Sequence, residues 1–147
     1  MNFQYTFQKV VDLKTNEKTQ AEWLLSNAIG NLQAEEQSLH QFIMNQNQMM
    51  QTLQSAIESK APAAEIQEIQ RYIDYLEQCI AKKRRDVDRA QINVQKKQAY
   101  LTTKVLDEKV WLKSREKAKE KFQHEMLLRE QNELDELAAV RFAIKAR

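Results

Sequence analysis

The stretch IESKAPAAEIQEIQ, from Ile57 to Gln70, holds the only proline of this 147-residue chain, and the only glycine, Gly30, lies far from it. A chain with so few turn-forming residues, and rich in Gln, Lys, Glu, Leu and Ala, predicts an all-α protein. Proline fits the first turn of a helix, where its missing N–H has no partner, and it disfavours helical geometry at the preceding residue. Pro62 therefore predicts a turn over about 60–64 between two helices.

Apolar side chains step away from Pro62 on both sides in alternating threes and fours, which is the spacing of a coiled-coil seam. The ladder before the proline runs through Ile57, Leu53, Met50, Gln46, Ile43, Leu39, Glu36, Leu32, Ile29 and Leu25. The ladder after it runs through Ile66, Ile69, Ile73, Leu76, Ile80, Lys83, Val87, Ala90, Val94 and Lys97. If the chain reverses at the proline, the numbers of facing residues add alternately to 122 and 123. The two ladders therefore predict an antiparallel pair of helices.

This register also predicts where the pairing ends. Phe3 comes opposite about Lys119, so the last part of the second helix has no partner within the chain. The expected fold is a long antiparallel two-helix coiled-coil hairpin with a C-terminal helical overhang, a rod forming a single domain over 1–147. We expect the first helix over about 2–59 and the second over about 62–140. Both ladders slip near Leu25 and Lys97, which predicts a stutter that locally unwinds the supercoil.

The composition argues against several classes of function. With one glycine, the chain cannot build a phosphate-binding loop of the GxxxxGK type. Its single cysteine, Cys79, cannot form an intrachain disulfide and points to a reducing compartment. The segment HEMLL, at 124–128, lacks the second histidine of a zinc-protease helix. We therefore expect no catalytic, cofactor-binding or metal-binding residue, and we predict that the protein is not an enzyme.

Charge and hydropathy argue against nucleic-acid and membrane partners. The net charge is +2, and acidic residues interrupt both basic runs, KKRRDVDR at 82–89 and KSREKAKEK at 113–121. Such runs are typical of solvated helix faces that carry pairs of opposite charge four residues apart. The N-terminus has no signal-peptide pattern, and no apolar run approaches the roughly 20 residues that span a bilayer. We therefore expect a cytoplasmic protein.

Two groups of apolar residues lie beside or beyond the predicted seam, and such exposed groups often mark interaction sites. The group near the proline consists of Phe42, Met49, Tyr72, Tyr75 and Cys79. It either widens the seam or forms a docking patch. The group at the open end of the hairpin combines Phe3, Phe7, Val10, Trp111 and Phe122 with Arg115, Lys117 and Lys119. Its basic surroundings would suit an acidic or carbonyl-lined socket.

Several segments resemble a known family. RYIDYLEQCI after the turn, WLKSREKAKEKFQ, the late REQNELDELA and the aromatic opening FQYTFQKVVDLK are similar to segments of the flagellar export protein FliJ. The resemblance spans essentially the whole chain and implies a soluble component of the flagellar type III export apparatus. Members of that family stand in the central hole of the hexameric export ATPase, like the stalk of a rotary ATPase, and promote its assembly and activity. They also contact the cytoplasmic domain of the export-gate membrane protein, and some escort export chaperones.

The resemblance also implies site residues, partners and a location. Carried over by position, the export-gate contact would comprise Phe42, Met49, Tyr72, Leu76 and Cys79. By analogy with rotary stalks, the ATPase-ring contact would lie at the open end and the overhang, with Phe7, Val10, Trp111, Arg115, Lys119 and Phe122. The protein would reach the membrane only through its partners, at the cytoplasmic face of the flagellar basal body.

Two other functions compete with this one. The chain could be a coiled-coil chaperone or scaffold hairpin of an injectisome-like or prefoldin-like assembly, or a basic helical protein that binds nucleic acid. Loss of motility on replacing Tyr72 and Phe42 by Ala, with the fold intact, would favour a specific docking patch. Retention on heparin or DNA at about 0.2 M salt, where non-specific contacts weaken steeply, would favour the nucleic-acid binder.

Overall fold

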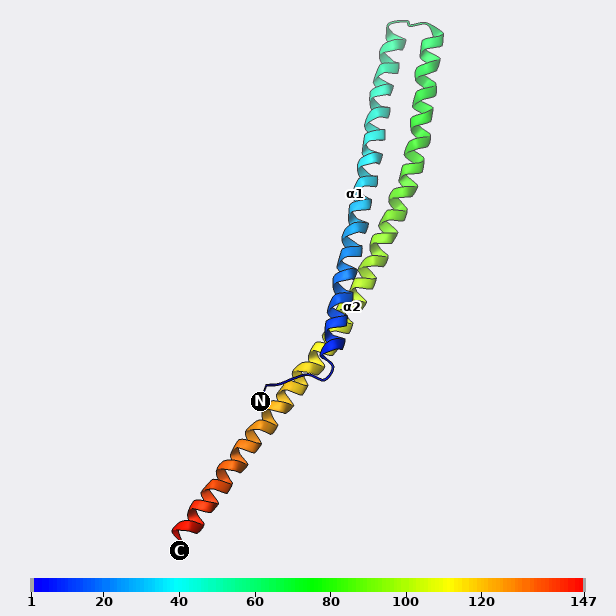
Figure 1. Cartoon of the computed structure of the whole chain (residues 1–147). Coiled ribbons are helices and arrows are strands. Elements are labelled where there is room, and N and C mark those ends of the chain that lie inside the picture. The colour runs from blue at the N-terminus through cyan, green and yellow to red at the C-terminus, as the bar shows by residue number, and fades with distance from the viewer. Residues whose placement is uncertain (1, 147) are drawn as a thin grey trace. The chain divides into compact units, whose positions relative to one another are not determined.

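The computed structural model describes residues 2–146, and its secondary structure consists of two long helices, α1 (Gln8–Glu58) and α2 (Ala63–Lys145). They form the antiparallel coiled-coil hairpin that the sequence predicts (Figure 1). The second helix continues to Lys145, a few residues beyond the expected end at about 140.

The first helix begins at Gln8, and not near residue 2 as the sequence predicts. The residues before Thr6 have no regular structure, and the chain turns at Thr6 and Phe7. The Tyr5 carbonyl accepts the N–H of Gln8 at 3.1 Å, which starts the helix. Phe3, Tyr5 and Phe7 stand at alternate positions, and alternate side chains share one face only when the chain is extended. The late start of α1 therefore lets these aromatic side chains lie together against α2.

The turn between the helices, residues 59–62, ends α1 with hydrogen bonds of the Schellman type. The N–H of Ala61 donates to the carbonyl of Ala56 at 2.9 Å, and the N–H of Lys60 donates to the carbonyl of Ile57 at 3.2 Å. Lys60 has a φ of 56°, in the left-handed region that favours glycine. The Pro62 carbonyl then accepts the first N–H bonds of α2, at 3.1 and 3.2 Å. The proline therefore lies at the tip and directly precedes the second helix, whereas the sequence predicts it within the first turn of that helix.

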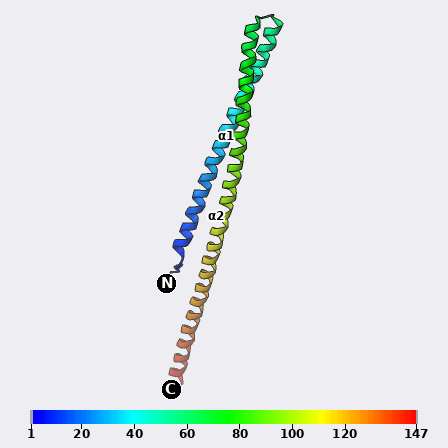
Figure 2. The same cartoon turned by 90° about the vertical axis from the view of Figure 1, so that its right-hand side faces the viewer.

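The chain divides into two compact units. We call Gln20–Thr102 the tip unit, and Met1–Thr19 together with Thr103–Arg147 the terminal unit. In the tip unit, α1 and α2 lie side by side in both views (Figure 1 and Figure 2). Their facing sides bury Ala21, Ala28, Ala56, Ile73, Leu76, Ile80 and Val87. The single domain expected over 1–147 stays a prediction.

The seam of the tip unit uses one row of α1 that differs from the predicted one. On α2 the predicted ladder is correct, since none of its ten residues is classed as exposed. On α1 the row that contains Leu53 is also correct. The second row of the α1 seam, which we call the companion row, lies one residue earlier in the sequence than predicted. Ala56 is 9% exposed and Ile57 is 52% exposed; Ala28 is 3% exposed and Ile29 is 39% exposed. The observed companion row is Ala56, Met49, Phe42, Glu35, Ala28 and Ala21.

Small side chains explain this shift. Alanine at facing positions lets two helices approach closely, while the bulkier side chains one residue further along α1 lie outside the seam and remain more exposed. With the observed row, the spacing of threes and fours continues unbroken from Ala56 to Ala21, and the numbers of facing residues add to a constant 122. The stutter predicted near Leu25 and Lys97 is therefore wrong, because both residues occupy regular positions of these rows.

In the terminal unit, the start of α1 packs against α2 through a seam that mixes apolar and charged residues. Val11 and Glu108 are buried there. The Nζ atom of Lys18 donates to Oε1 of Glu108 at 2.9 Å. From Leu127 onward, every described residue is exposed. We call Leu127–Lys145 the C-terminal arm; it is the overhang that the sequence predicts.

Candidate partner-binding surfaces

Aromatic side chains from both ends of the sequence gather in the terminal unit. The rings of Phe7 and Trp111 meet edge to face, with centroids 5.9 Å apart, and the rings of Phe3 and Phe122 are 5.5 Å apart. The ring of Tyr5 lies 5.8 Å from that of Phe7. The Phe3–Phe122 and Phe7–Trp111 pairs fix the N-terminal segment on α2, because aromatic contacts of this geometry stabilise beyond the area that they bury.

Basic groups border this aromatic cluster. The Nη1 atom of Arg115 donates to the Oε1 atom of Gln8 at 3.4 Å. A cavity of about 500 Å³ opens here, lined by Phe3, Tyr5, Gln8, Leu112, Arg115, Glu116 and Lys119. We call the aromatic residues of the preceding paragraph, with Val10, Arg115 and Lys119, the end cluster. Phe7 and Lys119 are exposed, whereas Val10, Trp111, Arg115 and Phe122 are half-buried. The structure thus gathers the six residues predicted for the ATPase contact in one unit.

A network of ion pairs continues from the end cluster along the same seam. Lys104 Nζ lies 3.3 Å from Glu17 Oε2, and Lys14 Nζ lies 3.6 Å from the same oxygen. The hydrogen bond from Lys104 lowers the pKa of Glu17, and the hydrogen bond from Lys18 lowers the pKa of Glu108. Both carboxylates are therefore held in the charged form. Paired charges at facing positions fix which residues lie opposite each other.

A second candidate surface lies in the tip unit and contains the residues predicted for the export-gate contact. Tyr72 is 44% exposed, and its ring stacks on that of Tyr75 with centroids 6.2 Å apart. A hydrogen bond with Cys79 raises the pKa of the Tyr75 hydroxyl, because it favours the protonated form. Phe42 and Met49 are half-buried, and in the observed register they lie level with Cys79 and Tyr72. We call Phe42, Met49, Tyr72, Tyr75 and Cys79 the tyrosine patch.

One residue predicted for this surface is buried. Leu76 is only 1% exposed and is the largest fully buried side chain among the described residues. It occupies a seam position one helical turn from Tyr72, where it packs between the helices. Its burial agrees with the ladder predicted for α2, in which Leu76 is a seam residue. A contact of Leu76 with the export gate stays a prediction.

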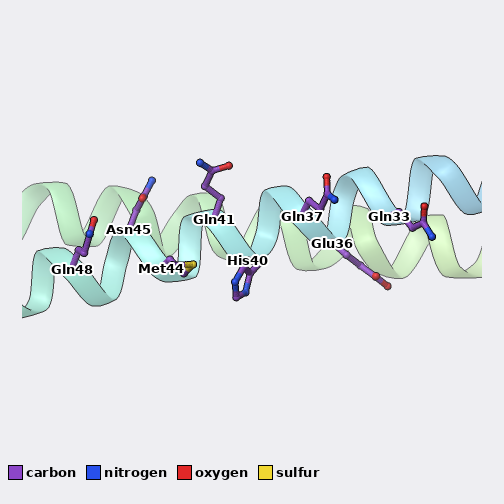
Figure 3. A pocket seen from close by; sticks show the side chains of 8 residues that line it. All are labelled: Gln33, Glu36, Gln37, His40, Gln41, Met44, Asn45 and Gln48. Carbon is purple, nitrogen blue, oxygen red and sulfur yellow. The ribbon is translucent and has the colours of Figure 1, made fainter.

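Another surface feature lies on the outer face of α1. Gln33, Glu36, Gln37, His40, Gln41, Met44, Asn45 and Gln48 border an open depression of about 880 Å³. Figure 3 shows that these side chains come from one helix and point in several directions instead of converging on one point. Binding sites for small molecules are concave and have converging polar groups. This depression is therefore an ordinary solvated helix face.

Sequence reasoning missed Tyr5, a member of the end cluster, and its neighbour Gln8. The hydroxyl groups of Tyr5 and Ser114 form a hydrogen bond of 2.9 Å, and Gln8 holds Arg115. Neither Tyr5 nor Gln8 stood out, because a helix beginning near residue 2 would have pointed them away from Phe3 and Phe7. The alternation of aromatic residues in FQYTF was the available signal, since it is typical of an extended segment.

The described part of the chain offers little for other kinds of site. No helix between residues 2 and 146 combines the length and the hydropathy needed to cross a membrane. Within the same residues, no three His, Cys, Asp or Glu side chains gather in a way that could hold a metal ion. The two surfaces described above, together with the C-terminal arm, are therefore the candidates for function.

Comparison with known proteins identifies the family. The sequence profile described as Flagellar FliJ protein matches residues 3–147, which is nearly the whole chain. The chain belongs to the FliJ family. The Flagellar FliJ protein of Bacillus subtilis (strain 168) is 25% identical over 145 residues, covering 99% of each chain. Members of this family are non-catalytic components of flagellar protein export.

A solved structure supports the fold. CT670 from Chlamydia trachomatis, described as a candidate YscO homolog, superposes with a TM-score of 0.69 over 97% of each chain. The two sequences are 16% identical, so this likeness concerns the fold alone.

Proposed function

We propose that this FliJ-family protein is the stalk and coupling component of the flagellar type III export apparatus. Its end cluster binds in the centre of the export ATPase hexamer and promotes ring assembly and ATP hydrolysis. Its tyrosine patch contacts the cytoplasmic domain of the export-gate membrane protein. Export chaperones are further partners, and the protein works in the cytoplasm, at the face of the flagellar basal body, without catalytic activity of its own.

The observation that carries this proposal is the end cluster, in a chain that matches the FliJ family over residues 3–147. Phe7 and Trp111 form one aromatic surface, with Arg115 and Lys119 beside it. Tryptophan, tyrosine and arginine dominate the binding energy of protein interfaces, because they combine large apolar area with a polar group. A ring lined by carbonyl or acidic groups would satisfy both the aromatic and the basic parts of this surface.

The ATPase contact is tested with the purified cognate export ATPase by measuring ATP hydrolysis and ring formation. We expect wild-type protein to stimulate both, and Phe7→Ala with Arg115→Glu to lower the stimulation about tenfold, because two anchors of the contact are lost. The matched control is Lys96→Glu, a charge reversal at an exposed position of the tip unit. Helix content by circular dichroism must stay unchanged in both variants. Equal stimulation by all three proteins would show that the end cluster is not the ATPase contact.

The gate contact is tested separately by binding to the isolated cytoplasmic domain of the gate protein. Tyr72→Ala is expected to weaken that binding and to reduce motility. Tyr100→Ala is the control, since Tyr100 lies on the same helix and is 44% exposed, like Tyr72. If both variants bind and swim alike, the tyrosine patch only widens the seam. If wild-type protein binds neither the export ATPase nor the gate domain, the chaperone or scaffold function explains the chain better.

A further inference from the structure

The C-terminal arm carries a row of apolar side chains that touches nothing in the described chain. Leu127, Leu134, Leu137 and Ile144 are each exposed by more than half. Figure 1 shows the arm, coloured orange to red, with no segment of residues 2–19 beside it. The four residues follow each other at steps of seven, three and seven, so they occupy the two seam positions of successive heptads. Glu130 and Arg141 fill the positions that remain in the same row.

A helix with such a row is expected to bury it. Removing apolar area from water is favourable in proportion to that area, and most of the stability of a helix in water comes from the packing of its apolar face. The arm therefore gains both hydrophobic energy and helical stability from a partner helix.

The row is complementary to itself when it is read in the opposite direction. In an antiparallel pair of arms, Leu127 faces Ile144 and Leu134 faces Leu137, each twice because of the two-fold axis. The only two charged positions of the row, Glu130 and Arg141, then face each other with opposite charge. A parallel pair would instead place Glu130 against Glu130 and Arg141 against Arg141, which is repulsive.

We propose that the C-terminal arm binds the same arm of a second copy of this chain, in an antiparallel two-helix pairing with Glu130 opposite Arg141. The pairing is about 28 Å long at 1.5 Å per residue, which is small for a stable interface. The dimer is therefore a weak and reversible one.

The charge of the arm argues against a lipid surface as the occupant of this row. Between residues 127 and 146 the chain has three basic and four acidic side chains, so the arm has no net attraction to anionic headgroups. The test of this proposal is separate from that of the stalk function, because it measures mass instead of ATP hydrolysis.

Sedimentation equilibrium of the full chain, over about 5 to 500 µM, tests the pairing. Wild type is expected to shift from monomer to dimer within this range, and Leu137→Glu is expected to remain monomeric. Glu130→Arg and Arg141→Glu should each weaken the dimer about tenfold or more, because each places like charges opposite one another. The double variant, Glu130→Arg with Arg141→Glu, should dimerise like wild type. Rescue of this kind occurs only in the antiparallel pairing.

Arg129→Glu and Glu136→Arg are the matched controls, because they make the same charge changes on the arm outside the row. They should dimerise like wild type, and circular dichroism should show the same hairpin in every variant. A chain that is monomeric throughout the range overturns the proposal. A double variant as weak as the single ones, or single variants without effect, also overturns it, because the dimer would then use another alignment or another surface.

Discussion

At the scale of single residues, the tip of the hairpin contains a strained position. Lys60 has a φ of 56°, where any residue with a Cβ atom is disfavoured relative to glycine. The two hydrogen bonds that close α1 hold it there, since they require a left-handed residue at this place. Lysine keeps a positive charge near the C-terminal end of the helix dipole, which offsets part of the strain.

Replacing Lys60 by glycine should therefore stabilise the tip unit by about 1 kcal/mol, because glycine adopts the left-handed conformation without steric cost. The free energy of unfolding is measured by urea titration. Lys60→Ala keeps the Cβ atom and serves as the control, with an expected change within about 0.5 kcal/mol. A glycine variant that is less stable than wild type would show that residue 60 is not held in the left-handed region.

At the scale of the helices, burial in the seam does not follow the hydropathy of neighbouring residues. Isoleucine is the more apolar residue, yet Ala28 is buried and Ile29 flanks the seam.

The substitution Ala28→Glu should destabilise the tip unit by about 3 kcal/mol or more, because it puts a charged side chain between the helices. Ile29→Glu, one residue away, should cost less than about 1 kcal/mol. Thermal unfolding of both variants measures the difference, and the reverse order would restore the row that the sequence predicts.

The ion pairs of the terminal unit predict a dependence of stability on pH. The pKa of Glu108 is lowered from its ordinary value of 4.5, mainly by the hydrogen bond from Lys18, and that of Glu17 is lowered by Lys104. A group whose pKa is lower in the folded state stabilises that state above its ordinary pKa and loses this contribution as the pH falls through the folded value. Stability should therefore fall below pH 4.5.

Thermal unfolding between neutral and acid pH measures this effect. Glu108→Gln should be less stable than wild type at neutral pH, and its midpoint should depend less on pH in the acid range, since one of the two titrating groups is gone. The variant Glu125→Gln is the control, because it removes a carboxylate on an exposed face of α2 beyond the ion pairs. Equal acid sensitivity of wild type and Glu108→Gln would contradict the role given to this pair.

Much of the architecture follows from the sequence, and the errors have physical causes. Pro62 gives the tip, and the α2 ladder gives one side of the seam, because both depend on backbone sterics and on simple periodicity. One of the two rows of α1 differs from the prediction because hydropathy favours Ile57 over Ala56, whereas close packing favours the smaller residue. For Leu76 the ladder correctly predicts a seam position, whereas the family resemblance implies a partner contact, because position along a family pattern says nothing about which way a side chain points.

The end cluster was predictable in part. Its α2 residues follow from the hairpin register, since Trp111, Arg115 and Phe122 come opposite the N-terminus in any antiparallel pairing around Pro62. The contribution of Tyr5 depends on six or seven N-terminal residues leaving the helix. That departure is decided by contacts with α2, which lie more than a hundred residues away in the sequence and leave no local signal.

At the scale of the whole molecule, the C-terminal arm should contribute nothing to the stability of the seam. In a variant that ends at Met126, all the described residues that are removed (127–146) are exposed, so its thermal midpoint should stay within about 2 °C of the wild-type value. A variant that ends at Lys113 removes Ser114 and Phe122, which bind Tyr5 and Phe3, and its midpoint should fall clearly. A large loss of stability on removing the arm alone would mean that the arm packs on the rest of the chain.

The unbroken spacing of the seam has a consequence for how this family can change over time. Adding or deleting one residue within either helix rotates everything beyond it by about 100°, which moves each seam row away from its partner. Substitutions at outward positions cost little by comparison. Relatives should therefore diverge by replacing side chains while keeping their length, with insertions confined to the tip, the chain ends or multiples of seven. Such a history agrees with a relative that shares only 25% of its residues yet aligns over 99% of both chains.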